Sequence, residues 1–432
     1  MTPGARIAAL QELLSLWEAQ ESPLDFMLRV YFRERRYIGS HDRRYLSETL
    51  FSLLRMVMLL DAWIERLNLK GYEVHRWRVI LYLVYQERQG LAALRALFSG
   101  MAYHPAILAP HEEEAIEAFI NEHKDWPSLP RWINLNCPQW LYELLASDYG
   151  EAGEDEIKAL NVPASLDLRV NTLKVGREKV KKDFQSQGLM ADLTSFSPLA
   201  LRLPRGTAVM QTDPYKRGWI EVQDEGSQLA ALLVDARRSQ NVLDYCAGGG
   251  GKALALAAAM ENKGELVATD ISLSRLQEAE KRFIRAGVTN GRCHLLPLQD
   301  ELHGTFERVL IDAPCSGIGT WRRNPDMRFR LTQERLAELL QKQKAILNEA
   351  SLFVAPRGRL IYATCSLLKK ENEAQIEEFL ATHPDFLVIP YGFVWEDVMK
   401  SPPPTDEDFL VLTPARHQTD GFFVAILERR PS

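Results

Sequence analysis

The chain has 432 residues, of which 46% are hydrophobic and 25% charged, and its formal net charge is −6. This length exceeds what one ordinary hydrophobic core accommodates, so it predicts two or three domains, and the acidic balance gives no overall indication of nucleic-acid binding. The apolar run at residues 79–85 is too short to cross a bilayer, and the first twenty residues lack the apolar centre of a signal peptide. We therefore expect a cytoplasmic protein with no membrane partner.

Residues 1–128 are predicted to form an all-helical domain. Gly39-Ser40 breaks the chain, and Asp42 follows in what would be the first turn of a helix, where the helix dipole favours an acid. The apolar residues after this break recur at helical spacing: Leu46, Leu50, Leu53, Leu54, Val57 and Met58. No strand pattern interrupts the region, which indicates a helical bundle.

Residues 129–215 are predicted to form a small α+β domain. Prolines within 126–130 mark its start. Apolar and polar residues alternate over 166–171, which is typical of a half-buried strand, and again over 199–203. Between them, residues 177–187 have the spacing of an amphipathic helix that Gly188 would end. Strand, helix and strand in so few residues suggest a fold similar to an RNA-binding motif.

Residues 216–432 alternate between strand and helix patterns, which predicts an α/β domain with a parallel, doubly wound sheet. The predicted strands cover 241–245, 266–270, 309–311, 360–363 and 421–427, and the predicted helices include 274–286 and 332–354. Ligands of such sheets bind at the carboxyl ends of the strands. We therefore expect the functional residues where the strands end.

The first of these strands runs into a glycine-rich loop. Four consecutive glycines, residues 248–251, precede Lys252, and Asp270 follows at the end of the next predicted strand. Glycine allows a ligand to approach the backbone, and an acid at the position of Asp270 is placed to hold ribose hydroxyls. On these residues alone, NAD and S-adenosylmethionine are both possible, and the loop could also be only a tight turn.

The five cysteines indicate neither a disulfide framework nor a zinc site, because their number is odd and none forms a CxxC pair. They are Cys137, Cys246, Cys293, Cys315 and Cys365. Cys315 and Cys365 each follow a strand-like run at the point where it breaks into a loop. Two such thiols downstream of a cofactor loop favour covalent chemistry, although a free cysteine is more often a small buried residue. No metal ligand set is predicted.

Three runs of the chain, in this order, resemble the motifs of the Nop/Sun family of RNA (cytosine-5)-methyltransferases. They are residues 245–252, 312–319 and 363–366. Residues 322–326 and 371–373 are also similar, and the helical N-terminal part resembles the NusB-like RNA-binding domain of the bacterial Sun/Fmu branch, which methylates small-subunit ribosomal RNA. The resemblance covers almost the whole chain and implies a Rossmann-like class I methyltransferase domain.

The chain departs from the family pattern at two places. Gly248 and Gly249 stand where the family usually has Ala-Pro, and Lys369-Lys370 stands where proline is common. The second departure is expected to be harmless. The first would make the cofactor loop more flexible, because glycine has more conformational freedom than either replaced residue.

The resemblance implies S-adenosylmethionine as the cofactor. Its amino acid end would be held by Cys246, Ala247, Gly248, Gly249, Gly250, Gly251 and Lys252. By the same resemblance Asp270 would hold the ribose, with Arg275 also among the cofactor-binding residues, and Asp300 would lie near the adenine. Asp312 would sit beside both the methyl donor and the target base.

The family chemistry explains why two cysteines are needed. Cytosine C5 is a poor nucleophile, and thiolate addition at C6 activates it. The resemblance makes Cys365 the nucleophile, Cys315 the residue that assists release, and Asp312 the proton donor near N3. The DNA enzymes use the cysteine of a Pro-Cys motif instead, which here would be Cys315.

The expected partner is RNA, most simply small-subunit ribosomal RNA bound by a monomer, with the target base unstacked from a loop or bulge. Basic residues cluster at 33–36, 43–44, 179–182 and 322–330. Among them Arg322, Arg323, Arg328 and Arg330 would hold phosphates beside the target, although such clusters are also common on solvated helices. Transfer RNA as substrate, a non-catalytic ribosome-assembly factor and an NAD-dependent oxidoreductase are the alternatives.

Overall fold

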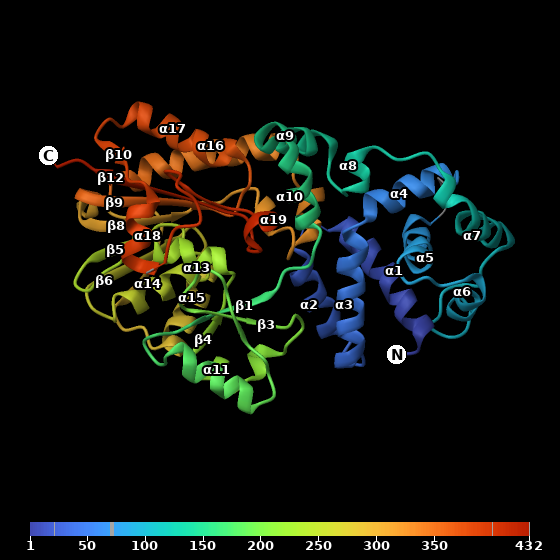
Figure 1. The fold of residues 1–432 in the computed structure, drawn as a ribbon. Helices are drawn as coiled ribbons and strands as arrows, with labels where there is room; N and C mark the ends of the chain where they lie inside the picture. The colour runs from blue at the N-terminus through green and yellow to red at the C-terminus, as the bar shows by residue number, and fades with distance from the viewer. Residues whose placement is uncertain (21, 70–72, 400, 432) are drawn as a thin grey trace. The chain divides into compact units, whose positions relative to one another are not determined.

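The computed structural model describes residues 1–20, 22–69, 73–399 and 401–431, which fall into two compact units (Figure 1). The helical unit comprises Met1–Asn161 together with Asn324–Arg330, and the sheet unit comprises Val162–Arg323 and Leu331–Ser432. The short segment Asn324–Arg330 therefore leaves the sheet unit and returns to it.

The helical unit is built around α5, which is buried on nearly all sides. Its helices are α1 (Pro3–Ala19), α2 (Leu24–Glu34), α3 (Ser40–Leu54), α4 (Val57–Arg66), α5 (Val74–Tyr85), α6 (Leu91–Leu97), α7 (Pro110–Glu122), α8 (Arg131–Asn134), α9 (Gln139–Tyr149) and α10 (Gly153–Leu160). Its described residues also form the 3₁₀ helices η1 (His123–Asp125), η2 (Gly150–Ala152) and η6 (Pro325–Phe329). The predicted helical character of the N-terminal region is confirmed. The helix α5 is mostly apolar, and its two buried arginines, Arg76 and Arg78, are paired with carboxylates.

The helix predicted across residues 46–58 is interrupted. It begins after Gly39 as expected, but it ends at Leu54, and α4 starts at Val57. The side chain of Asn136 explains the break, because its amide donates to the Leu54 carbonyl at 2.9 Å and its oxygen accepts from the Met58 N–H at 2.9 Å. In a continuous helix those two backbone groups would bond to each other. The inserted amide satisfies both groups across a gap in the helix.

The sheet unit begins with a four-stranded antiparallel sheet in the order β2-β3-β1-β4. Its elements are β1 (Leu166–Val170), α11 (Arg177–Ser186), β2 (Asp192–Leu193), β3 (Ala200–Leu203), η3 (Val209–Gln211), α12 (Asp213–Lys216) and β4 (Ile220–Val222). Val180 and Phe184 of α11 are buried against it, and Gly188 follows the helix at φ +75°, as the sequence predicts. The helices of the helical unit continue to Leu160, so the predicted boundary at residue 128 lies within that unit. The small sheet ends only with β4, so the predicted boundary at residue 215 lies before its last strand.

Strand β1 is buried on both faces, so the prediction of a half-buried strand is wrong. Asp167 and Arg169 on its polar face are 1% and 2% exposed. Arg202 forms a two-pronged ion pair with Asp167 at 2.6 and 2.8 Å, and Arg169 donates to the Gly251 carbonyl at 2.7 Å. The alternation of polar residues misled the prediction because these polar groups are paired inside the protein instead of facing water.

The remainder of the sheet unit is a doubly wound α/β sheet, which confirms the predicted fold class. The strands follow the order β10-β12-β9-β8-β5-β6-β7, with β11 on β12; β7, β6, β5, β8 and β9 are parallel, and β10, β11 and β12 are antiparallel additions. Their bounds are β5 (Asn241–Asp244), β6 (Glu265–Asp270), β7 (Gly291–Leu295), β8 (Phe306–Asp312), β9 (Val354–Thr364), β10 (Phe386–Val388), β11 (Leu410–Leu412) and β12 (Phe422–Arg429).

Helices cover both faces of this sheet (Figure 1). On one face lie α13 (Glu225–Leu232), α14 (Gly251–Ala259), α15 (Leu273–Ala286) and α18 (Tyr391–Met399), and on the other α16 (Gln333–Ser351) and α17 (Glu373–Thr382). The remaining short helices are η4 (Asp300–Leu302), η5 (Ile318–Thr320), η7 (Lys369–Glu371) and α19 (Pro414–His417). Successive strand residues divide between the two cores, Val242 to one and Leu243 to the other. Within the described ranges, no helix combines the length and apolar character that spanning a bilayer requires.

The ion pair of the small sheet predicts a large loss of stability when it is broken. Arg202→Ala leaves the fully buried Asp167 carboxylate without its guanidinium, which typically costs about 3–5 kcal/mol. Urea unfolding followed by circular dichroism measures this loss. Arg205→Ala, at an exposed position three residues along, is the control and should change the free energy of unfolding by no more than about 0.5 kcal/mol. Equal unfolding midpoints for the two variants would contradict the assigned role.

Candidate active site

Four neighbouring parallel strands bring their carboxyl ends to the same edge of the large sheet. There β5 leads into the glycine loop, β6 ends at Asp270, β8 ends at Asp312, and β9 leads into Cys365. This is the edge where doubly wound sheets bind ligands. Most of the residues singled out from the sequence therefore lie at the ends of adjacent strands.

The glycine loop combines an open backbone with a tight turn. Gly250, at φ +76°, caps α14, and a Cβ there would lie 2.9 Å from the Ala279 Cβ. Gly248, at φ +54°, has nothing within 4 Å of the place its Cβ would occupy. The positive φ values need glycine, and the open side of Gly248 gives a ligand access to the backbone. Arg282 donates to the Gly249 carbonyl at 2.6 Å, so the loop is braced despite its glycines.

Asp270 holds the other side of this loop. Its buried carboxylate accepts from the Gly248 N–H at 3.0 Å and from the Ser272 N–H at 2.8 Å. Arg275 is exposed, with a guanidinium nitrogen 3.9 Å from the same carboxylate. Each carboxylate oxygen has a second lone pair. The position suits the ribose role, which stays a prediction.

Lys252 and Asp312 form an ion pair below the glycine loop. The Lys252 ammonium is buried, lies 2.7 Å from an Asp312 carboxylate oxygen and is 5.4 Å from the centre of the Phe422 ring. Asp312 keeps about a third of its side chain exposed, 36%. The pair therefore presents one partly open carboxylate at the end of β8.

Asp244 is a third charged group here, and the sequence reasoning missed it. It is fully buried at the end of β5, and within the described residues neither of its carboxylate oxygens has a side-chain hydrogen-bond partner. Burial, with a smaller contribution from the nearby Asp312, raises the pKa of Asp244 to about 7, although Lys252 and the Ala253 backbone N–H oppose the shift. The sequence signal for this site is an acid that directly follows the apolar pair Val242-Leu243 at the end of a predicted strand.

The two cysteines predicted to act together are in contact. The Cys315 and Cys365 sulfur atoms lie 3.4 Å apart, and both side chains are partly exposed. The hydrogen bond to Cys365 raises the pKa of the Cys315 thiol well above its ordinary value, and burial adds to the shift. Either thiol can donate to the other across this contact, and the raised pKa favours the protonated form of Cys315.

The other three cysteines have suppressed reactivity. Burial raises the pKa of Cys137 to about 12 and that of Cys293 to about 11. It also raises the pKa of Cys246, and the carboxylates around the glycine loop add to this effect. A thiol with a raised pKa forms little of the reactive thiolate. These values agree with structural or backbone roles for all three.

Glu371 connects the loops that carry the two cysteines, a role that sequence reasoning did not assign. Its side chain is fully buried in η7. One oxygen accepts from the Ser316 N–H at 2.8 Å and the Gln343 amide at 3.0 Å, and the other accepts from the hydroxyls of Ser316 and Ser366. Each serine directly follows one of the cysteines. A single buried carboxylate therefore fixes both thiol-bearing loops.

Two of the four arginines predicted to bind phosphates near Cys315 are instead held by groups of the protein. Arg323 is bound by Asp420 at 2.5 Å and by Asp224 at 2.8 Å. Arg328 is fully buried in the helical unit, where it donates to the Asn136 carbonyl at 2.7 Å. Arg322 donates to the Thr419 carbonyl at 2.9 Å, and Arg330 lies 3.6 Å from Asp326. The prediction is wrong for Arg323 and Arg328, because structural partners take their donors.

Asp300 is less clearly part of the site. It lies in η4 beyond β7, its side chain is 93% exposed, and its carboxylate is 3.6 Å from a His303 ring nitrogen. Within the described residues, no hydrogen bond or ion pair joins it to the glycine loop. Its role near the adenine stays a prediction.

Comparison with known proteins identifies the family. Residues 231–428 match the family model described as 16S rRNA methyltransferase RsmB/F, and residues 137–210 match the ferredoxin-like domain of RsmF/B-like methyltransferases. A probable ribosomal RNA small subunit methyltransferase B of Synechocystis sp. is 31% identical over 92% of this chain and 93% of its own. Its counterpart in Bacillus subtilis is 27% identical over 99% of both.

Solved structures share the fold. The crystal structure of PH0851 matches 99% of both chains with a TM-score of 0.80 and 26% identity. NSun6 from Pyrococcus horikoshii, solved with SFG, matches 68% of this chain and 99% of its own with a TM-score of 0.59 and 20% identity.

The doubly wound sheet and the glycine loop at its carboxyl edge define a Rossmann-like methyltransferase domain. The chain belongs to the ribosomal RNA small subunit methyltransferase B family. The resemblance predicted from the motifs is thereby confirmed, and S-adenosylmethionine, the predicted cofactor, is the cofactor of this family.

The buried acid predicts a pH-dependent gain of stability in Asp244→Asn. Because the folded protein holds the Asp244 pKa near 7, above the usual 3.8, ionising this group opposes folding as pH rises between these values. The free energy of unfolding of the variant, relative to that of the parent, should therefore rise by up to about 1.4 kcal/mol per pH unit between roughly pH 4 and 7. Urea unfolding of both proteins without cofactor, at several pH values, measures the difference. A constant difference from pH 4 to 8 would contradict the assigned burial.

The Glu371 contacts predict that Glu371→Ala separates the two thiols. The substitution leaves buried donors unpaired, each at a cost of about 1–3 kcal/mol, and releases both cysteine loops. In the parent, diamide should oxidise the two thiols, 3.4 Å apart, to a disulfide that peptide mapping detects. The variant should form much less of it and lose methyl transfer. Glu377→Ala, at an exposed position in α17, is the control, and equal disulfide yields in the two variants would contradict the role.

Proposed function

We propose that the protein transfers a methyl group from S-adenosylmethionine to C5 of a cytosine in small-subunit ribosomal RNA through a covalent bond between Cys365 and C6 of the base. The observation that carries this proposal is the contact of the two thiols, 3.4 Å apart, at the edge of the sheet that also holds the glycine loop. The ribosomal RNA methyltransferase relatives support the RNA substrate.

The residues at the sheet edge fit the cofactor. Gly248 offers an open backbone, Asp270 has lone pairs for ribose hydroxyls, and the buried Asp244 carboxylate has no side-chain partner among the described residues. The loop from Cys246 to Lys252 would hold the amino acid end of the cofactor. When bound, S-adenosylmethionine supplies an electrophilic methyl group on a sulfonium.

Activation of the base begins at the thiol pair. Cys315, which its raised pKa keeps protonated, donates to Cys365 and stabilises the thiolate. The Cys365 thiolate adds to C6, so a sulfur–carbon bond forms and electron density moves toward C5. A proton at N3 assists this addition, and Asp312 would deliver it, drawing on the Lys252 ammonium bound 2.7 Å away.

Release reverses the addition. Once C5 carries the methyl group, a base takes the C5 proton, the sulfur–carbon bond breaks, and Cys365 leaves as a thiolate. The N3 proton would return to the pair formed by Asp312 and Lys252. Cys315, in contact with Cys365, would assist this step. Glu371 keeps both cysteine loops in place throughout.

Two other functions fit the site less well. Transfer RNA as the substrate would use the same site, but the relatives are ribosomal RNA enzymes. A non-catalytic assembly factor would have no need for two thiols in contact, or for the Glu371 carboxylate that fixes their loops. We therefore propose a cytoplasmic enzyme that acts as a monomer on ribosomal RNA.

The two cysteine roles predict different trapped species. Cys365→Ala should abolish methyl transfer and form no adduct, because the first step is lost. Cys315→Ala should still add to the base but stall at release, which leaves a protein–RNA adduct that survives denaturants. A denaturing gel of each variant with unmodified 16S ribosomal RNA transcript and S-adenosylmethionine tests this.

The gel also shows how the proposal would fail. An adduct with Cys365→Ala, and none with Cys315→Ala, would reverse the two roles and make Cys315 the nucleophile. Full activity in both variants without any adduct would refute the covalent mechanism. Methyl transfer to transfer RNA but not to the 16S transcript would contradict the proposal that ribosomal RNA is the substrate.

A further inference from the structure

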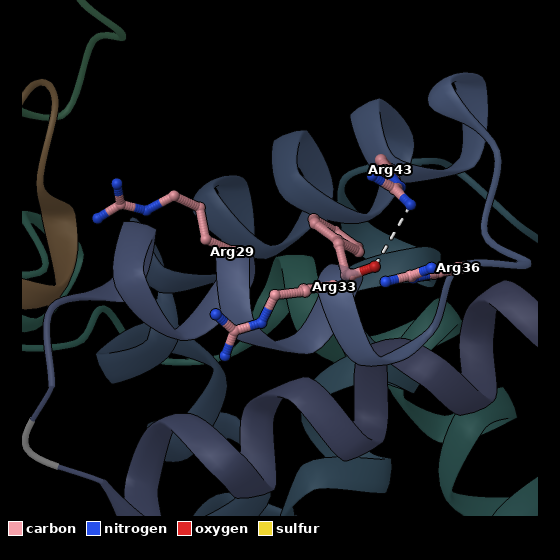
Figure 2. Close-up of a pocket in the computed structure, with 5 residues that line it drawn as sticks. Arg29, Arg33, Arg36 and Arg43 are labelled. Carbon is pink, nitrogen blue, oxygen red and sulfur yellow. Dashed lines mark hydrogen bonds between the residues drawn. The ribbon is translucent and has the colours of Figure 1, made fainter.

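A cluster of arginines on the helical unit has no role in the chemistry described above. Arg29 and Arg33 lie one turn apart on α2, Arg36 follows in the connecting loop, and Arg43 lies on α3. With Phe32 they line an open hollow of about 390 Å³ (Figure 2). We call this cavity, together with the four arginines that line it, the arginine hollow.

One member of the hollow is fixed by the protein itself. Arg43 donates to the Ile38 carbonyl at 2.8 Å and to the Phe32 carbonyl at 3.3 Å, and its guanidinium lies 5.6 Å from the centre of the Phe32 ring. Figure 2 shows the bond from Arg43 to the backbone of α2. Both acceptors are neutral carbonyls, so the positive charge of Arg43 is held in place without being balanced.

The other three members are exposed and poorly balanced. Within the described residues, neither the Arg33 nor the Arg36 side chain forms an ion pair or a hydrogen bond. Arg29 has Asp25 one turn earlier; burial raises the pKa of that carboxyl, and Arg29 acts to lower it. Two further carboxylates, Glu12 and Glu34, lie beside Arg35, at 2.6 and 3.6 Å from its guanidinium nitrogens. Like charges four residues apart on a helix repel each other, so this arrangement favours an anion in the hollow.

The contrast with the arginines near Cys315 is informative. Arg323 and Arg328 have internal partners, whereas Arg33 and Arg36 have none within the described ranges. In a chain of net charge −6, four arginines around one hollow create a local positive field. Guanidinium groups match phosphate oxygens with paired N–H donors.

Two exposed aromatic rings accompany the hollow. Tyr37, 75% exposed, directly follows Arg36, and Phe26, 52% exposed, has its ring centre 5.9 Å from the Arg29 guanidinium. Exposed aromatic side chains between arginines suit a nucleic acid, whose unstacked bases stack on rings while its phosphates bind guanidinium groups. A free phosphate or an acidic peptide would make no such use of the rings.

We propose that the arginine hollow binds the phosphate backbone of the RNA substrate, with Arg33 and Arg36 as the principal contacts. The proposal rests on the proposed function only in taking RNA as the substrate. The site anchors the RNA and takes no part in methyl transfer.

The test measures binding of full-length protein to unmodified 16S ribosomal RNA transcript at several salt concentrations, without cofactor. In Arg33→Ala/Arg36→Ala, the slope of log affinity against log salt should fall by about two, since each lost phosphate contact removes about one released counterion. The affinity should fall most at low salt. Arg33→Lys/Arg36→Lys should keep the slope but bind less tightly, because lysine cannot form paired hydrogen bonds to phosphate.

The matched control is Arg95→Ala/Arg131→Ala. It removes the same charge from exposed positions of the helical unit, where the two arginines are paired with Glu113 at 2.7 Å and Glu154 at 2.6 Å. Its salt slope should equal that of the parent. An unchanged slope in the Arg33/Arg36 alanine variant, or an equal loss in the control, would overturn the arginine site.

The outcome is separable from that of the proposed chemistry. Binding is measured without S-adenosylmethionine, so a failed adduct experiment would leave this result standing. Once RNA is saturating, methyl transfer by the Arg33/Arg36 alanine variant should match the parent rate, with only a higher KM for RNA. A lowered rate at saturating RNA would contradict a pure anchoring role.

Discussion

The active edge of this protein depends on one buried carboxylate. Glu371 accepts four hydrogen bonds, and three of them come from the serines that directly follow Cys315 and Cys365. Hydrogen bonds to a charged group are each worth about 1.5–3 kcal/mol, and burial makes an unpaired partner expensive. The thiol contact is therefore a consequence of a satisfied polar network, because the cysteines are placed by their neighbours.

The same network joins two parts of the chain that approach the site from different strands. Ser316 follows β8 and Ser366 follows β9, and these strands are adjacent and parallel in the sheet. The Glu371 backbone carbonyl also accepts from the Tyr362 hydroxyl at 2.8 Å, and Asn372 binds the Thr364 hydroxyl at 2.6 Å. The short helix η7 thus packs onto the end of β9 and orients the Glu371 carboxylate. Rigid elements of this kind hold reacting groups more closely than loops alone.

Charge at the neighbouring strand ends is arranged differently. Lys252 neutralises Asp312 within the protein, while Asp244 is left buried without a side-chain partner in the described part of the chain. An acid buried in this way destabilises the fold once ionised, and proteins tolerate such costs mainly at functional sites. A cationic ligand at this edge would offset the cost.

The sequence by itself determined the class of the sheet, its glycine loop and the pairing of two cysteines at strand ends. These follow from periodicity and local motifs, which are properties of neighbouring residues. Only the tertiary structure decided the partners of charged side chains. The sequence pattern predicts that Arg323 and Asp167 are exposed to solvent. In the structure Arg323 forms an ion pair with Asp420, and Asp167 forms one with Arg202. Likewise the break before Val57 depends on Asn136, and the placement of the cysteine loops depends on Glu371 reaching Ser316. A polar side chain faces water or a buried partner according to what folds against it, and no local pattern contains that information.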